Sequence, residues 1–255
     1  MHEKGSFIYL QLWALGRTAR LEILTEDGHE LVAPSPISAG EGYNTPRALT
    51  IPEIQEYIQW YAQAAKNAVE GAGFDGVEIH GANGYLIDQF LQDVTNQRTD
   101  VYGGSVEARS KFGLQVVDAV VKAIGQERTG LRVSPWGRFQ STFFVLKYYR
   151  NDVQKDSGMK MQDPIPQFSH FIGTIAQSYP NFAYLHVVEP APGNPNESND
   201  FLRRIWKPRA FISCGGYTAE SAIERADKDP DELVAFGQWY ISNVSFLFFF
   251  LPQSC

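Results

Sequence analysis

Short apolar segments alternate with helical segments along this chain, and this alternation constrains its fold more than any other feature. The segments at 183–188, 210–213 and 233–237 are apolar at nearly every position instead of at every second one. Strands of that kind are buried on both faces, as in a parallel sheet covered by helices. The order of strand, helix, strand and helix therefore predicts an α/β fold.

The strand count does not decide between two α/β architectures. About six strands are predicted, at 6–13, 76–80, 130–136, 183–188, 210–213 and 233–237. Helices are expected at about 50–70, 85–91, 106–124 and 164–178, with another that Thr218 caps, while 16–50 and 190–200 look like loops. A TIM barrel has eight strands. A doubly wound sheet can have six, but no strand here precedes the Gly-x-Gly-x-x-Gly turn of its dinucleotide-binding form.

Charge and cysteine content narrow the functional class. The net charge is −7 and the basic residues form no stripe, which argues against nucleic-acid binding. The two cysteines, Cys214 and Cys255, do not form a disulfide framework, which favours a reducing compartment. No secretory leader is visible, and the apolar run at 244–251 is too short to cross a bilayer. We expect a cytoplasmic protein without a membrane span.

Polar side chains gather where the strand at 76–80 ends. His80 closes the strand, and Asn83 and Tyr85 follow it in a glycine-containing turn before an apolar helix. In α/β folds, this end of the strand is where sites are built. From the periodicity alone, Tyr85 fits better an aromatic residue that opens the apolar helix face with Leu86 and Phe90. His80 fits equally a histidine bonded to the backbone.

Several segments together resemble the Old Yellow Enzyme family. They are Gln11-Leu12-Trp13, 80–86 (HGANGYL), 88–91 (DQFL), 96–100 (NQRTD), 102–105 (YGGS), 131–135 (LRVSP), Phe236-Gly237 and 241–243 (ISN). The resemblance covers most of 1–140 and 158–243. It implies a (β/α)8 TIM barrel with about six of the eight strands in this chain. It further implies an FMN-dependent ene-reductase of fungal type, a kind that includes enzymes of alkaloid metabolism.

Two segments depart from the family pattern. Residues 141–157 fall between a predicted strand and its helix and look inserted, and 244–255 replace the family's continuation with an atypical apolar tail. Family members also carry two barrel strands and part of the flavin site ahead of the position of Met1. The resemblance therefore implies an incomplete barrel at 1–243, as expected of a truncated member whose insertion and tail derive from unspliced intron sequence.

The resemblance assigns a reaction to the polar residues. In the family, NADPH reduces FMN, and the flavin then reduces the C=C bond of an α,β-unsaturated carbonyl compound. His80 and Asn83 match the pair that binds the substrate carbonyl oxygen, where charge develops. Tyr85 matches the proton donor. Trp13 is either a wall of the substrate site or part of the core.

The flavin contacts are implied in the same way. Gln11 and Arg132 match contacts to the flavin ring, and the backbone of Gly215, Gly216, Gly237 and Gln238 would approach the phosphate. The family usually has arginine where this chain has Gln238. That change removes a charge-assisted contact of about 1.5–3 kcal/mol. No histidine has a second ligand at metal spacing, so no metal is expected, and Glu78 is expected to be a paired structural carboxylate.

Three functions remain open on this basis. The first is an FMN- and NADPH-dependent reductase of a small enone or enal, with no nucleic-acid or membrane partner. The second is an inactive family member that does not hold FMN. The third is a (β/α) protein that binds a ligand without redox chemistry. The oligomeric state and the physiological substrate are not predicted.

Overall fold

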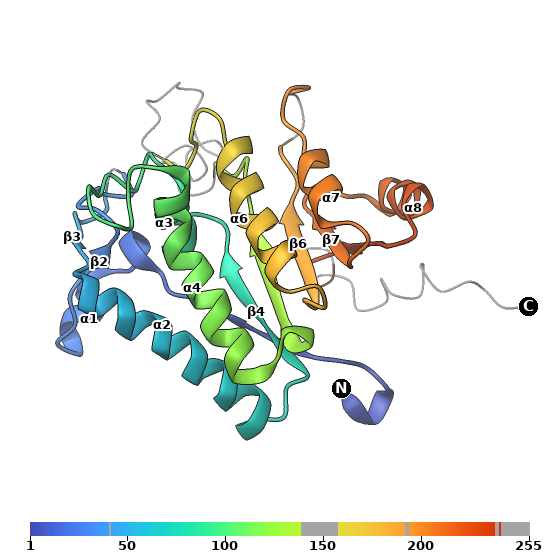
Figure 1. Cartoon of the computed structure of the whole chain (residues 1–255), viewed down its shortest axis with the longest axis horizontal. Coiled ribbons are helices and arrows are strands. Elements are labelled where there is room, and N and C mark those ends of the chain that lie inside the picture. Colours follow the sequence, from blue (N-terminus) through green and yellow to red (C-terminus); the bar gives the residue numbers. More distant parts are fainter. Residues whose placement is uncertain (41, 139–157, 192–193, 238–239, 241–255) are drawn as a thin grey trace, which may run out of the picture.

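The computed structural model describes the chain apart from residues 41, 139–157, 192–193, 238–239 and 241–255 (Figure 1). Its centre is a sheet of six parallel strands in the order β1-β4-β5-β6-β7-β8. They are β1 (Tyr9–Leu12), β4 (Gly76–Gly81), β5 (Thr129–Val133), β6 (Tyr184–Val188), β7 (Phe211–Cys214) and β8 (Glu232–Ala235). Each strand pairs with the next one of this sheet along the chain, as in a barrel wall, whereas the order reverses in a doubly wound sheet. The predicted parallel α/β sheet is confirmed, and its order is that of a barrel.

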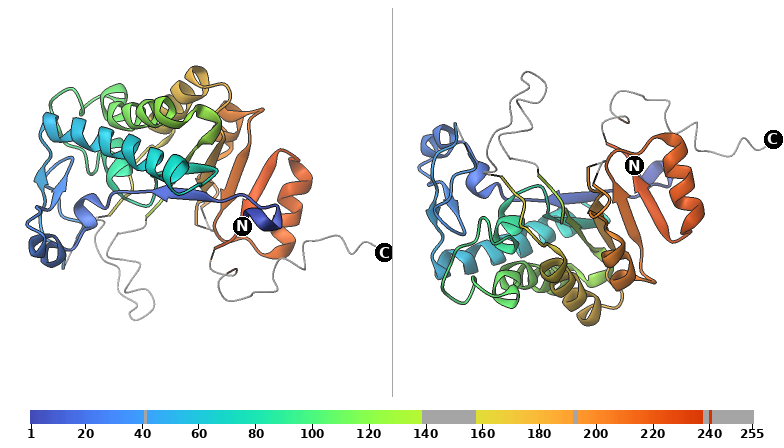
Figure 2. Two further views of the ribbon diagram at one scale, coloured as in Figure 1. Left: turned by 90° about the horizontal axis from the view of Figure 1, so that it is seen from below. Right: turned by 90° about the horizontal axis from the view of Figure 1, so that it is seen from above.

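Helices pack along one face of this sheet. The main ones are α2 (Ile51–Lys66), α4 (Val106–Ile124), α6 (Ile165–Ser178), α7 (Asp200–Trp206) and α8 (Ala219–Lys228). The first four pack on one another in chain order, and α8 contacts β8 (Figure 2). Alternate strand residues point toward the helices; Val77, Ile79 and Leu131 are among them and are 0% exposed. The apolar core therefore lies between sheet and helices, which leaves the other side chains of the strands to the opposite face.

Side-chain caps fix where the long helices begin. The Thr50 hydroxyl accepts from the Glu53 amide, and the Glu53 carboxylate accepts from the Thr50 amide, which makes a capping box at α2. Ser105 caps α4, and Thr218 with Ser221 caps α8. The predicted helix at 50–70 is confirmed; its last turn, η3 (Asn67–Gly71), is a π-helix.

Several short helices and strands were not predicted. The segment at 16–50, interpreted as a loop, contains η2 (Gly16–Thr18), α1 (Leu21–Glu26) and a parallel pair of two-residue strands, β2 (Val32–Ala33) and β3 (Arg47–Ala48). α7 follows directly after the loop at 190–200. Elements this short show too few apolar repeats for a period to be recognised. The predicted insertion at 141–157 and tail at 244–255 lie outside the described residues.

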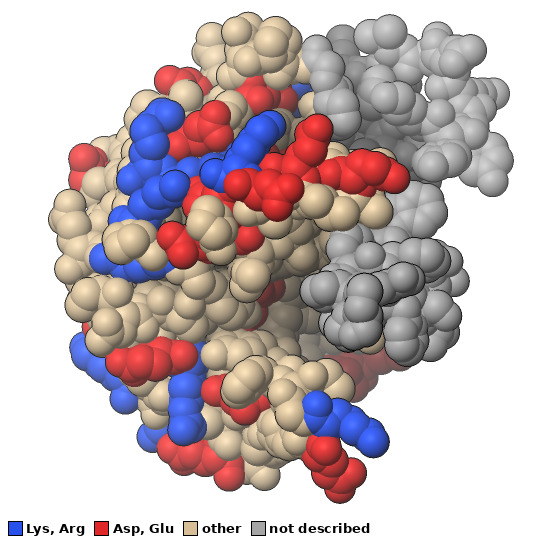
Figure 3. Space-filling view, turned by 90° about the vertical axis from the view of Figure 1, so that its right-hand side faces the viewer, with Lys and Arg blue, Asp and Glu red and all other residues tan. Residues whose placement is uncertain are grey.

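The surface carries charges of both signs. On the face shown in Figure 3, basic and acidic side chains are interspersed. Within the described residues, no helix combines the length and the apolarity that crossing a membrane requires.

Candidate active site

The sheet face away from the helices carries a row of polar side chains. Val77 and Ile79 point into the core. Because successive side chains of a strand alternate in direction, Glu78 and His80 point to the opposite face. The strand register places Gln11 beside Glu78, His80 beside Arg132, and Arg132 beside His186. Strand pairing therefore brings together residues from β1, β4, β5 and β6 that are far apart in the sequence.

Glu78 is the centre of this row. One of its oxygens accepts a 2.6 Å hydrogen bond from Gln11 Nε2, and the other lies 2.9 Å from His186 Nδ1. Burial opposes ionisation of Glu78, but His186 and Gln11 outweigh it and lower its pKa. Burial likewise opposes protonation of His186, but Cys214 and Glu78 raise its pKa to about 9. Glu78 is thus a paired carboxylate, as predicted, and it orients the Gln11 amide.

His80, Tyr85 and Trp13 form a compact aromatic group at the carboxyl end of β1 and β4. The centroid of the Tyr85 ring lies 4.9 Å from that of His80 and 4.6 Å from that of Trp13, both edge to face. Trp13 also stacks on His80 with centroids 6.2 Å apart. His80 is 3% and Trp13 52% exposed, so Trp13 covers the histidine and itself faces outward. The sequence predicted that Trp13 is either a wall of the substrate site or part of the core. Its exposure excludes a place in the core.

Backbone contacts fix the tautomer of His80. The Ala82 amide donates to His80 Nδ1 over 3.2 Å. Burial, followed by the Arg132 charge, lowers the pKa of His80 to about 4, so the ring is neutral at pH 7. A neutral imidazole that accepts at Nδ1 carries its proton on Nε2. His80 Nε2–H is therefore available to donate a hydrogen bond.

The turn after β4 holds Asn83 in an unusual conformation. Asn83 has φ 56° and is the only non-glycine residue with positive φ among those described; Gly84 follows with φ 74°. The Asn83 amide donates to Ser134 Oγ over 2.8 Å, and the Gly84 amide donates to Asp88 Oδ2 over 2.9 Å. Sequence reasoning missed Ser134 and Asp88. The position of Ser134 directly after β5 was the available signal.

Arg132 has unused capacity to donate. Its Nη2 donates to Cys214 Sγ over 3.4 Å, while its buried Nε has no hydrogen-bond partner among the described residues. A guanidinium with a buried and unpaired N–H fits an anionic or carbonyl group of a ligand. This orphaned donor on β5 and the oriented Gln11 amide on β1, with β4 between them, fit the polar edge of a flavin ring.

Two glycines follow β7 at the same end of the sheet. Gly215 and Gly216 have φ 106° and 73°, values that favour glycine, and a Cβ added at Gly216 would meet nothing within 4 Å. The backbone at Gly216 can thus be approached closely, as a phosphate site requires. Gly237 is exposed just beyond β8. Gln238, predicted beside it, lies outside the described residues.

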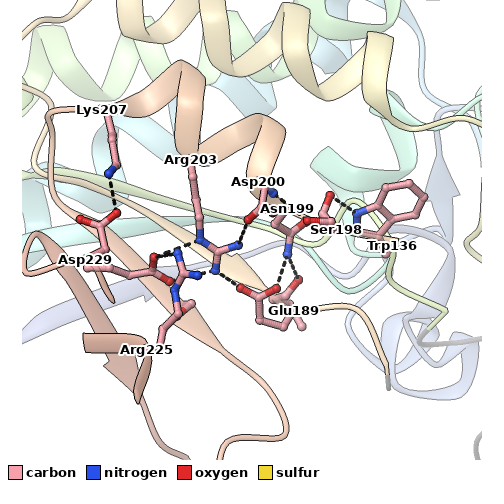
Figure 4. Close-up of polar contacts among 12 residues, drawn as sticks. Trp136, Glu189, Ser198, Asn199, Asp200, Arg203, Lys207, Arg225 and Asp229 are labelled. Carbon is pink, nitrogen blue, oxygen red and sulfur yellow. Dashed lines mark hydrogen bonds and ion pairs between the residues drawn. The ribbon is translucent and has the colours of Figure 1, made fainter. Parts of the chain in front are cut away.

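A buried ion network supports the diglycine (Figure 4). Arg203 on α7 bonds both oxygens of Glu232 over 2.9 and 3.0 Å and also bonds Glu189 at the end of β6. Arg225 bonds Glu232 as well. The Glu189 amide donates to the Cys214 carbonyl over 2.8 Å. The network therefore joins α7, α8 and β8 to the strand end next to Gly215.

Comparison with known proteins places this arrangement in a family. Residues 1–250 match the NADH:flavin oxidoreductase / NADH oxidase family. The chain is 46% identical over 258 residues to a protein of Claviceps purpurea (strain 20.1) named "Probable inactive dehydrogenase easA". It is 47% identical over 253 residues to "Chanoclavine-I aldehyde reductase fgaOx3" of Penicillium roqueforti (strain FM164). Each alignment covers 95% of this chain and 63% of the relative.

A solved structure supports the same assignment. The Old Yellow Enzyme from Pichia sp. AKU4542 superposes with a TM-score of 0.79 at 35% identity, over 95% of this chain and 61% of that one. This chain spans about 63% of the length of the two curated relatives. The family match extends over nearly all of the chain and includes the strands that carry the polar row. This chain belongs to the NADH:flavin oxidoreductase / NADH oxidase family, with fungal relatives in sequence and an Old Yellow Enzyme fold.

Proposed function

We propose that this chain carries the substrate-binding part of an FMN- and NADPH-dependent oxidoreductase that reduces the C=C bond of small α,β-unsaturated aldehydes or ketones. The observation that carries the proposal is the neutral Nε2–H donor of His80 beside the Tyr85 hydroxyl-bearing ring and the turn that holds Asn83. The relative named chanoclavine-I aldehyde reductase supports an aldehyde substrate and a role in alkaloid metabolism. The low cysteine content supports a cytoplasmic location.

The chain's own residues would bind and protonate the substrate. His80 Nε2–H and the Asn83 side-chain amide donate hydrogen bonds to the carbonyl oxygen, where negative charge develops during reduction. Tyr85 donates the proton that the α-carbon receives, because an enolate is basic enough to take it from a phenol. Trp13 covers His80 and excludes water from it. FMN, when bound, supplies the hydride that originates from NADPH.

The described residues that would hold FMN lie on the polar face of the sheet or just after its strands. Arg132 and Gln11 would bind the polar edge of the ring, and the backbone at Gly215 and Gly216 would bind the phosphate together with Gly237 and Gln238. Arg132 Nε supports this assignment because it is a buried donor without a partner among the described residues. A neutral Gln238 weakens the phosphate side.

A second candidate is a protein that binds a carbonyl compound without reducing it. The relative named "Probable inactive dehydrogenase easA" favours this candidate, as does the neutral Gln238. Such a protein would use the His80 and Asn83 donors and would not require flavin.

The visible spectrum of the purified chain distinguishes the two candidates. The chain is mixed with FMN, freed of unbound flavin and assayed for NADPH oxidation that depends on 2-cyclohexen-1-one. Bound flavin together with enone-dependent oxidation is the expected result. Binding of the enone by a chain that retains no flavin would support the second candidate and contradict the first. The double variant H80A/N83A should bind neither enone nor enal and serves as the control.

A further inference from the structure

Helix α3 (Leu86–Leu91) is buried along its whole length, and its polar residues need an explanation. All six of its residues are buried, and so is Gln92, which ends it. Asp88, Gln89 and Gln92 are each 0% exposed. A buried polar side chain lowers stability unless it is hydrogen-bonded, so the partners of these three side chains indicate their use.

Two of these side chains bond to the turn that carries Asn83. Asp88 Oδ2 accepts from the Gly84 amide over 2.9 Å, and Asp88 Oδ1 accepts from Gln92 Nε2 over 2.9 Å. Gln89 Nε2 donates to the Gly84 carbonyl over 2.7 Å and to the Leu15 carbonyl over 3.0 Å. The amide and the carbonyl of Gly84 are thus both bonded from the helix, which fixes the orientation of the two peptide units on either side of Gly84.

Asp88 also acts on the residue before Gly84. Ser134 Oγ accepts from the Asn83 amide over 2.8 Å, and the same side chain lowers the pKa of Asp88. Asn83 and Gly84 both have positive φ, a conformation that costs a non-glycine residue free energy and persists only where the surroundings hold it. Asp88 therefore bonds Gly84 directly and acts on Asn83, the strained residue, through Ser134.

We propose that Asp88 is a positioning residue that holds the left-handed turn at Asn83 and Gly84 and so aims the Asn83 side-chain amide at the substrate carbonyl. The second half of this inference rests on the proposed function of the site. The first half concerns the turn alone and holds for either candidate function.

The charge state of Asp88 provides a way to observe this role. Burial raises its pKa to about 7, against smaller opposing effects of Gln92, the Gly84 amide, Arg17 and Ser134. Arg17 on η2, 1% exposed, is the charged group that acts on it. Because the folded-state pKa lies above the ordinary value, this carboxyl group stabilises the fold at low pH, and that contribution is lost as the pH rises through about 7. An ionised carboxylate is also the stronger acceptor for the Gly84 amide.

The test is a pH titration of the full chain, labelled with ¹⁵N, followed at the backbone amides of Asn83 and Gly84. We expect the Gly84 amide proton to move downfield with a midpoint near pH 7. D88N, which keeps an acceptor oxygen without the titration, should abolish that midpoint and retain the Asn83 signal near its wild-type position. The control D118N replaces a carboxylate on α4 that bonds Tyr179 and Lys122, and should leave the midpoint unchanged.

Substrate binding supplies the second measurement. With 2-cyclohexen-1-one as the probe, D88A should shift the Asn83 signals and weaken binding about tenfold, while D88N binds within about threefold of wild type; one lost hydrogen bond has this magnitude. D88A with unchanged Asn83 and Gly84 signals would overturn the proposal, as would a pH-dependent shift of the Gly84 amide that D88N leaves in place. If wild type does not bind the enone but Gly84 titrates as expected, the proposed function fails and the positioning of the turn stands.

Discussion

Two regions at the carboxyl end of the sheet are held in place by different kinds of interaction. The turn region, residues 80–88, relies on hydrogen bonds to single amides and on the aromatic contacts of His80 and Tyr85. The diglycine region, residues 213–216 with Glu189, relies on Arg203, which bonds Glu189 and Glu232. The turn region is therefore held mainly by hydrogen bonds and aromatic contacts, and the diglycine region by ion pairs.

This difference has consequences for what each region can bind. In the turn region, a neutral His80 leaves an N–H donor that attracts a carbonyl oxygen without attracting anions. In the diglycine region, two arginines face two glutamates, so the network offsets its own charge. Because these arginines are already paired, we expect an anion in this region to be bound by backbone N–H groups and by Gln238.

Replacing Tyr85 by phenylalanine should have the largest effect and should be confined to the turn region. Without the proton donor, the rate of enone-dependent NADPH oxidation should fall about 10²–10⁴-fold, while flavin content stays the same. The matched control is Tyr102→Phe, whose hydroxyl bonds Gln55 and Gln115. An unchanged rate in Tyr85→Phe would remove the acid role from this residue.

Replacing Arg203 by alanine should mainly affect folding. The change leaves Glu232, with a side chain 1% exposed, and Glu189 without their shared partner. Losing one partner of a buried ion pair costs about 3–5 kcal/mol in the free energy of unfolding. Urea denaturation measures it, with Arg204→Ala on the exposed side of α7 as control. Equal stability of the two variants would show that the network does not order the diglycine region.

Acid should weaken the same network in the unmodified chain. Burial opposes ionisation of Glu232, but Arg203 and Arg225 outweigh it and lower its pKa to about 2 from 4.5. Because the folded-state pKa is lowered, the stabilisation is complete above about pH 4.5 and is lost as the pH falls through about 2. Arg203→Ala should flatten this acid limb of the stability profile.

The sequence was sufficient to place His80, Asn83 and Tyr85 together in the turn region, because the information for these three residues is local. A strand, a glycine turn and an apolar helix follow one another within residues 76–91, and His80, Asn83 and Tyr85 occur in that single stretch. The capping pairs at Thr50 and Thr218 are local in the same way, so these helix starts could be predicted. Periodicity also sufficed for the long helices and the strands, since each spans enough residues to show a pattern.

Contacts between distant strands could not be predicted in this way. Glu78 and His186 are 108 residues apart, and Arg132 and Cys214 are 82 apart. They meet only because the register aligns β4, β5, β6 and β7. The support that Asp88 gives to the turn was missed for another reason. Asp88 lies in an apolar helix, and the sequence does not tell which side of that helix packs against the turn.

Replacing Gln238 by arginine should strengthen FMN binding without altering the turn region. Restoring the charge that the family usually has at this position should improve FMN binding by about 1.5–3 kcal/mol. Fluorescence quenching of FMN measures the affinity, and Gln238→Met, which removes the polar group at similar size, should weaken it. If arginine leaves the affinity unchanged, position 238 does not contribute to the phosphate site.

The smallest expected effect is an absence of titration at His80 across the neutral range. Histidine in water titrates near pH 6.5, whereas burial and Arg132 lower the pKa of His80 to about 4. The ring nitrogens in ¹⁵N spectra should therefore show one neutral tautomer, protonated at Nε2, from about pH 5.5 to 8. Because the folded-state pKa is lowered, the neutral ring's contribution to stability is complete above about pH 6.5, and is lost as the pH falls through about 4. A titration of His80 near pH 6.5 would mean that the turn region also binds with a full charge, and the distinction between the two regions would fail.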